Sequence, residues 1–239
     1  MSTLSTIFQP LALPWLDIVA LGWFTLWWLS YVWYADRRTL KRPTLRLQMN
    51  KFVRTWMVRM VERDNRMLDI NVIRNLTRSS QFFASTTMLI LGALVALMGY
   101  AEKAAGVMAE LPFAQQVPER IWEMKILLLV LIFVYAFFKL SWSIRQFGIC
   151  SILVASTAKV PEDAPAFDPQ TFAKHIERVA LIICFANANF NNGLRAYYFG
   201  AAALSWFLHP ILMMILTVGV VHVLYRREFT SRTLKATVD

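Results

Sequence analysis

The residues best suited to chemistry in this chain are arginines and asparagines that border long apolar segments. Asn191, Asn192 and Arg195 lie directly before or at the start of a stretch, 196–225, that carries no Asp, Glu, Lys or Arg. A guanidinium beside amide groups suits an anion, a lipid headgroup or a polar substrate. Arg78 precedes an earlier apolar segment in the same way, and we predict that Arg78 and Arg195 line a shared vestibule. The alternative is that Arg195 snorkels to the membrane surface while the asparagines cap a helix.

A second group of polar residues, Ser85, Thr86 and His209, falls inside the apolar segments. Polar groups inside a membrane are costly and often mark function. Ser85 and Thr86 can line a pore or bond to a neighbouring helix. His209 lies near the middle of the last segment, where it can act in a site or simply bond a carbonyl freed by Pro210.

No catalytic or metal-binding motif accompanies these residues. A glycine-rich phosphate loop, a His-Glu-x-x-His pair and a nucleophile elbow are all missing from the sequence. The histidines (His175, His209 and His222) and the cysteines (Cys150 and Cys184) lack the spacing of metal ligands. We therefore expect a protein that is not an enzyme and that holds neither a cofactor nor a metal.

The apolar segments that must position these residues predict an integral membrane protein. Hydrophobic residues make up 57% of the chain and charged residues 17%. About 20 apolar residues are enough to cross a bilayer core of about 30 Å. We predict an all-α, polytopic fold in which residues 1–239 form a single membrane domain with cytoplasmic helical extensions at 36–81 and 143–195. The predicted spans are four, at about 15–34, 82–100, 125–142 and 196–225.

The charges between the spans predict the orientation. Segment 36–81 holds twelve Lys or Arg against four Asp or Glu, whereas segment 101–124 holds two against four. Cytoplasmic loops carry the excess of basic residues, so we expect the cell inner membrane, a cytoplasmic 36–81 segment and an external N-terminus. The net charge of +10 then favours anionic lipid headgroups as partners rather than nucleic acid.

The C-terminal tail conflicts with this orientation. Four spans place the tail outside, although it holds Arg226, Arg227, Arg232 and Lys235. A fifth membrane-embedded segment within 176–195 would remove the conflict, because it would return the tail to the cytoplasmic side.

Local patterns predict three further features. Pro43 is a natural helix start, and an amphipathic helix of about four turns follows it. The helix of the third span continues past Arg145 into the cytoplasm. The asparagines at 187–193 predict a break at the membrane surface, and Pro210 predicts a bend within the last span.

Two sequence motifs carry a resemblance to a known family. They are Asn-Asn-Gly-Leu-Arg-Ala-Tyr-Tyr-Phe-Gly at 191–200 and Leu-Ser-Trp-Phe-Leu-His-Pro at 204–210, supported by Ser-Thr-Thr-Met at 85–88 and the basic linker after the first span. Together they resemble the domain-of-unknown-function 599 family, multi-pass membrane proteins of bacteria and plants. The resemblance covers nearly the whole chain and implies four transmembrane helices without an assigned activity.

Two functions fit these features. The first is a homo-oligomeric channel or transporter, because four helices in one chain hardly enclose an aqueous path. Its pore-lining candidates are Ser85, Thr86, Asn191 and His209. The second is a membrane scaffold or accessory subunit, whose basic cytoplasmic layer binds anionic lipid or another membrane complex.

Overall fold

The computed structural model describes residues 15–38, 44–100, 119–157 and 169–238, and these residues fold almost entirely into helices. No β-strand occurs among them, which confirms the all-α prediction. The elements are α1 (Trp15–Arg38), α2 (Leu45–Val61), α3 (Met67–Met98), α5 (Glu119–Ser156), α6 (Pro169–Leu204), the short 3₁₀ helix η1 (Ser205–Phe207), α7 (Pro210–Phe229) and α8 (Arg232–Lys235).

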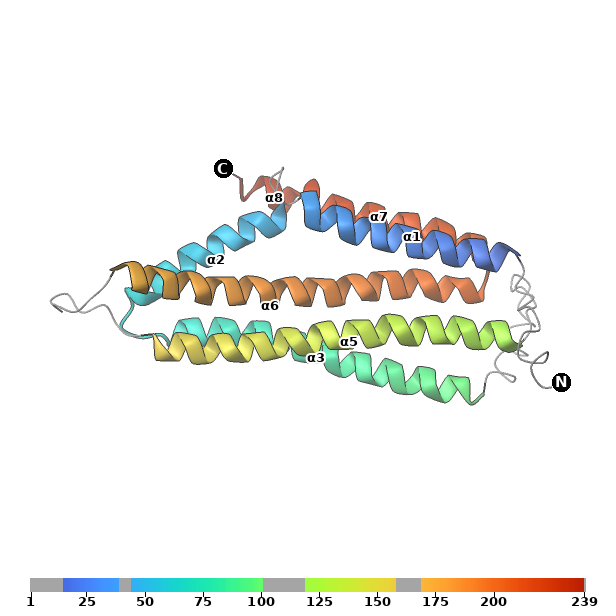
Figure 1. Ribbon diagram of the computed structural model, residues 1–239, viewed down its shortest axis with the longest axis horizontal. Helices are drawn as coiled ribbons and strands as arrows, with labels where there is room; N and C mark the ends of the chain where they lie inside the picture. The colour runs from blue at the N-terminus through green and yellow to red at the C-terminus, as the bar shows by residue number, and fades with distance from the viewer. Residues whose placement is uncertain (1–14, 39–43, 101–118, 158–168, 239) are drawn as a thin grey trace, which may run out of the picture.

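The long helices lie roughly along one axis, with α5 and α6 in the middle (Figure 1). Helix α3 packs against α5, and α1 packs against α7, which also contacts α6. Helices α1, α5 and α7 run in one direction, and α3 and α6 run in the other (Figure 1). We call the half of the bundle beyond the last turns of α1 and α7 the basic end; α8 lies at its inner border, near mid-length, and α2 runs from there towards the first turns of α3 (Figure 1). The opposite end carries η1 and the first turn of α1.

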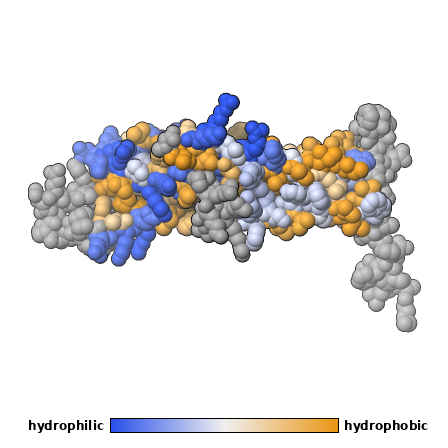
Figure 2. Space-filling model, turned by 90° about the horizontal axis from the view of Figure 1, so that it is seen from above, coloured by the Kyte–Doolittle hydropathy of each residue, from blue (hydrophilic) through white to orange (hydrophobic). Residues whose placement is uncertain are grey.

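Four of the described helices are long and apolar enough to cross a membrane. They cover Trp15–Ala35, Met67–Met98, Arg120–Ser156 and Pro210–Lys235. Helix α5, with 38 residues, is about 57 Å long and so outruns a bilayer core of about 30 Å. As predicted, its helix therefore continues well past Arg145. Hydrophilic side chains gather towards the basic end, whereas the other half of the visible face is mainly apolar (Figure 2).

Helix α6 is a fifth traverse of the bundle. Helices α5 and α7 run in parallel, so the chain must return between them, and α6 makes this return over 36 residues, about 54 Å. It is less apolar than the four helices above because it contains several asparagines and Arg195. The C-terminal helix α8 consequently lies at the basic end, where it contacts α2. The return along α6 puts the basic tail on the side of segment 36–81. A membrane-embedded segment within 176–195 stays a prediction, since α6 is not among the helices long and apolar enough to cross a membrane.

The prediction of one helix over 196–225 is wrong. Residues 196–204 end α6, η1 reverses the chain, and α7 starts at Pro210. Proline lacks the backbone N–H and suits the first position of a helix, so Pro210 starts a new helix instead of bending an old one. His209 caps this helix, since its Nδ1 accepts a hydrogen bond from the N–H of Ile211 at 3.2 Å.

The predicted break at 187–193 is also wrong, because α6 is continuous through the asparagines. Asparagine has a modest helix propensity, which tertiary packing overrides. The predicted amphipathic helix after Pro43 is confirmed as α2, and Thr44 caps it by accepting a hydrogen bond from the N–H of Leu47 at 3.1 Å.

Two apolar cores stabilise the bundle. One joins α1, α5, α6, η1, α7 and the end of α3, with Phe24, Ile126, Phe199 and Trp206 nearly inaccessible to solvent. The other lies towards the basic end and joins α2, the start of α3, the end of α5 and the start of α6; its buried residues include Met57, Ile73, Phe147, Val154, Val179 and Ile183. The boundary between these cores is where the polar residues of α6 lie.

Candidate functional site

A cavity of about 560 Å³ opens between α2, α3, α6 and α7, close to the boundary between the two cores. We call it the basic cavity. Its polar lining includes Arg46 and Asn50 from α2, Asn187, Asn191 and Arg195 from α6, and Arg227 and Glu228 from α7. Its apolar lining includes Met49, Phe52, Val53, Trp56, Val72, Leu76, Ile183, Phe190 and Leu194. The cavity therefore combines cationic and amide groups with an extensive hydrocarbon wall.

Arg195 is the most deeply placed cation of this cavity, with only 8% of the residue exposed. Its Nη1 donates a hydrogen bond to Oδ1 of Asn192 at 3.2 Å, and its guanidinium lies 5.5 Å from the ring centre of Tyr31. Its Nη2 lies 4.0 Å from Oε2 of Glu228, a loose ion pair. A guanidinium has five N–H donors. Contacts with the described residues leave several of these donors for a ligand.

Two further arginines border the same space. Arg227 donates a hydrogen bond to the hydroxyl of Tyr198 and lies over the ring of that tyrosine. The backbone N–H of Arg46 donates to Oε1 of Glu228 at 3.3 Å. Glu228 is the only carboxylate among the described residues that line the cavity, against three arginines. The formal charge of this lining is therefore +2, which favours an anionic ligand.

Helix α2 forms the cover of the basic cavity and is fixed at its C-terminal end. The indole N–H of Trp56 and the guanidinium of Arg63 both donate to Oδ1 of Asp69, each at 2.6 Å. Asp69 is fully buried. Buried carboxylates need such paired donors, so this cluster holds α2 against the start of α3.

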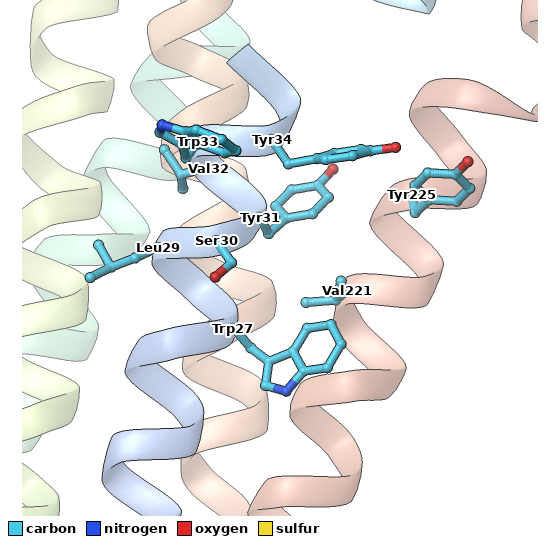
Figure 3. Close-up of a pocket in the computed structure, with 9 residues that line it drawn as sticks. All are labelled: Trp27, Leu29, Ser30, Tyr31, Val32, Trp33, Tyr34, Val221 and Tyr225. Atoms are coloured by element: carbon cyan, nitrogen blue, oxygen red, sulfur yellow. The ribbon is translucent and has the colours of Figure 1, made fainter. Parts of the chain in front are cut away.

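An aromatic groove of about 1010 Å³ adjoins the basic cavity along α1 and α7. Figure 3 shows Trp27, Tyr31 and Tyr34 of α1 on the side of the helix that faces Val221 and Tyr225 of α7. Tyr31 lines both the groove and the basic cavity. The groove lies within the segments able to cross a membrane. The buried side chain of Tyr31 thus lies between the aromatic groove and the basic cavity.

The sequence places the chain in a known family. The model of the family described as "Protein of unknown function, DUF599" matches residues 19–233. The chain belongs to the DUF599 family. No curated protein and no solved structure matches it significantly. The resemblance found in the sequence motifs is therefore confirmed, and it extends from α1 to α8.

The structure brings together three of the four residues predicted for an anion site in this DUF599 chain. Asn191 and Arg195 line the basic cavity, and Asn192 holds the guanidinium of Arg195. Arg78 lies apart from them: it is exposed on α3 and is not part of the cavity lining. The two arginines therefore do not share this cavity.

The intramembrane polar candidates do not converge on one site. Ser85 is exposed on α3, and the hydroxyl of Thr86 donates to the carbonyl of Phe82 in its own helix at 2.9 Å. His209 caps α7 at the opposite end of the bundle rather than lying at mid-span. A hydroxyl close to them in α3 does reach another helix: Oγ1 of Thr87 lies 2.7 Å from the Tyr197 hydroxyl of α6.

Sequence reasoning missed Arg46, Arg227 and Glu228 as members of the site. The reversal of the chain at η1 brings Arg227 and Glu228 of α7 back beside Arg46 of α2. The available signal was the cluster of charges at 226–228 directly after an apolar run.

Within the described residues, no group of three or more His, Cys, Asp or Glu side chains is placed to hold a metal ion.

A buried ion pair closes the opposite end of the bundle. Oδ1 of Asp17 accepts a hydrogen bond from the indole N–H of Trp206 at 2.7 Å and lies 3.6 Å from Nζ of Lys125. Lys125 also donates to the Trp206 carbonyl at 2.9 Å. All three residues are nearly inaccessible to solvent. This cluster ties α1, α5 and η1 together at the point where the chain reverses.

Proposed function

We propose that this DUF599 protein is a non-enzymatic, multi-pass inner-membrane protein that binds an anionic phospholipid of the cytoplasmic leaflet. The basic cavity would receive the headgroup, and the aromatic groove would receive an acyl chain. The observation that carries the proposal is that one residue, Tyr31, lines both the basic cavity and the aromatic groove, so the two sites are neighbours. In this role the protein acts as a scaffold or accessory subunit whose basic layer engages the membrane.

The chemistry of the cavity supports an amphiphilic anion. Its volume of about 560 Å³ lies within the range of about 300–1,000 Å³ typical of small-molecule sites. Arginine suits phosphate groups because its planar fork can donate two parallel hydrogen bonds. The amides of Asn50, Asn187 and Asn191 supply donors and acceptors beside the arginines. A small soluble anion has no hydrocarbon part that could pack against the apolar lining of the cavity.

The charge distribution supports the orientation within the proposal. The basic end faces the cytoplasm, since cytoplasmic segments carry the excess of Lys and Arg. Five traverses then put the N-terminus outside and the C-terminus inside, so that Arg226, Arg227, Arg232 and Lys235 join the basic layer. The cytoplasmic leaflet is the one that bears anionic lipid.

Native mass spectrometry of the delipidated protein, titrated with phosphatidylglycerol, tests this function. Replacing Arg195 with glutamine is expected to weaken lipid binding at the basic cavity at least tenfold, because a charge-assisted bond of about 1.5–3 kcal/mol is lost. Arg46→Gln should weaken binding in the same direction while leaving its backbone bond to Glu228 in place. Arg78→Gln removes an exposed charge outside the cavity and serves as the matched control.

The proposal requires that Arg78→Gln binds like the wild type and that phosphatidylethanolamine binds more weakly than phosphatidylglycerol. Equal weakening by Arg78→Gln and Arg195→Gln would show that only the overall charge matters, and the proposed site would be rejected.

Transport by a homo-oligomer is the second candidate. The observation that favours it is the exposure of Ser85 on α3, a helix whose principal contact among the described helices is with α5. A second copy of the chain can cover such a face and complete a polar path. Native mass spectra recorded for the titration also report the oligomeric state: a single stable ring supports transport, and a monomer with bound lipid supports the scaffold.

A further inference from the structure

The asparagines of α6 face two different cavities. Asn187 and Asn191 line the basic cavity. Asn189 lies two residues from each, which turns it by about 200° around the helix. It lines a second cavity, of about 440 Å³, on the α5 side. The other residues of this second cavity are Phe138, Lys139, Ser141, Trp142 and Arg145, all from α5. The two cavities therefore lie at the same level of α6 but on different sides of it.

The cationic group of the second cavity is the ammonium group of Lys139. Nζ of Lys139 lies 3.5 Å from Oδ1 of Asn189 and over the ring of Tyr135, at 5.7 Å from its centre. The amide nitrogen of Asn189 donates to Oε1 of Gln146 at 2.8 Å and to the carbonyl of Phe185 at 3.0 Å. These bonds orient the Asn189 oxygen towards Lys139. In the described part of the chain, no carboxylate lies within ion-pair distance of Lys139. Asn189 and Tyr135 therefore fix the position of the ammonium group, but no anionic side chain balances its charge.

The surroundings of Lys139 suit a lipid rather than a soluble ion. Phe138 is 67% exposed and Trp142 is 51% exposed, on a helix able to cross a membrane. Tryptophan prefers the level of the lipid headgroups. Arg145 is exposed and lies between Trp142 and the basic end of α5, so the site carries two cations with apolar rings beside them.

We infer that the second cavity is a separate binding site for the phosphodiester of an anionic phospholipid. Lys139 and Arg145 contact the phosphate, and Phe138 and Trp142 pack against an acyl chain. The site goes beyond the proposed function, because it shares no residue with the basic cavity and lies on a different pair of helix faces. Both sites lie at the level of Asn187–Asn191 along α6, so the inference places the lipid headgroups of both at the same depth in the membrane.

Titration of the delipidated full-length protein with phosphatidylglycerol, followed by native mass spectrometry, tests the second site. The wild type is expected to retain two lipids. The double variant Lys139→Gln/Arg145→Gln should lose one of them, with about a tenfold fall in affinity for that step. Arg195→Gln should lose the other lipid and keep this one. Arg74→Gln, an exposed arginine on α3, should keep both.

Three results would overturn the inference. The first is an unchanged lipid count in Lys139→Gln/Arg145→Gln and in Arg145→Gln alone, whose exposed side chain carries little risk for folding. The second is equal retention of phosphatidylethanolamine, because the site would then ignore net charge. The third is displacement of the lipid by millimolar inorganic phosphate, which would identify a site for free anions. The phosphatidylethanolamine and phosphate experiments are done on Arg195→Gln, which lacks the lipid of the basic cavity, so that they report on the second cavity alone.

Discussion

Replacing Lys125 with methionine is expected to destabilise the folded protein by about 3–5 kcal/mol. The substitution keeps the volume of the side chain but leaves the Asp17 carboxylate buried without its cation. Oδ2 of Asp17 already lacks a hydrogen-bond partner among the described residues, so the indole of Trp206 would be the only remaining donor. Thermal unfolding followed by fluorescence-detected size exclusion in detergent measures the effect.

A double-mutant cycle separates this effect from a general loss of packing. Adding Asp17→Asn to Lys125→Met removes the uncompensated charge, while the asparagine oxygen can still accept from Trp206. We therefore expect the double variant to recover more than half of the lost stability. Lys51→Met, on the exposed face of α2, is the matched control and should unfold like the wild type. A Lys125→Met protein as stable as this control would show that the buried pair does not hold the end of the bundle.

Replacing Gly193 with alanine is expected to lower stability by about 1–3 kcal/mol, the usual cost of an overpacked core. A Cβ at this position would lie 2.7 Å from Cγ and 2.9 Å from Cδ2 of Leu140 on α5. Leu140 is fully buried, so it has little room to move. Small residues allow such close approach between membrane helices.

Gly92→Ala is the matched control for Gly193→Ala. Nothing lies within 4 Å of a Cβ at Gly92, which also occupies the interior of a helix. The higher helix propensity of alanine then predicts a neutral or slightly stabilising effect. Adding Leu140→Ala to Gly193→Ala should relieve the clash and recover part of the stability. If both glycine variants behave alike, the contact between α5 and α6 is looser than the structure indicates.

Hydropathy and charge were enough to predict much of the fold. The all-α class, the helix after Pro43 and the extension of α5 beyond Arg145 follow from helical periodicity and segment length, which are local properties. Asn191, Asn192 and Arg195 were recognised as a group because polar residues beside a long uncharged run are costly unless they are paired or functional.

Several of the errors fall in the region 196–225, where a local rule competes with tertiary structure. The run 196–225 is long enough to read as one span, and hydropathy alone does not separate it into the end of α6 and the whole of α7. A proline within a long apolar run predicts a kink, but Pro210 starts a helix. Arg46, Arg227 and Glu228 were missed because only the reversal at η1 brings α7 beside α2. The pairing of Asp17 with Lys125 likewise joins residues far apart in the chain.

The topology that we propose has α6 as a fifth crossing of the membrane, beside the four helices long and apolar enough to cross, with the C-terminus on the same side as the basic end. Single cysteines at Asn71, Thr233 and Trp15, all exposed positions, test it through labelling of intact and permeabilised cells with an impermeant maleimide. The native Cys150 and Cys184 are buried, so the wild-type protein measures the background. We expect Asn71→Cys and Thr233→Cys to react only after permeabilisation and Trp15→Cys to react in intact cells. If Thr233→Cys and Trp15→Cys both react in intact cells, the two ends of the chain lie outside. This result would contradict the proposed topology and the cytoplasmic placement of the basic cavity.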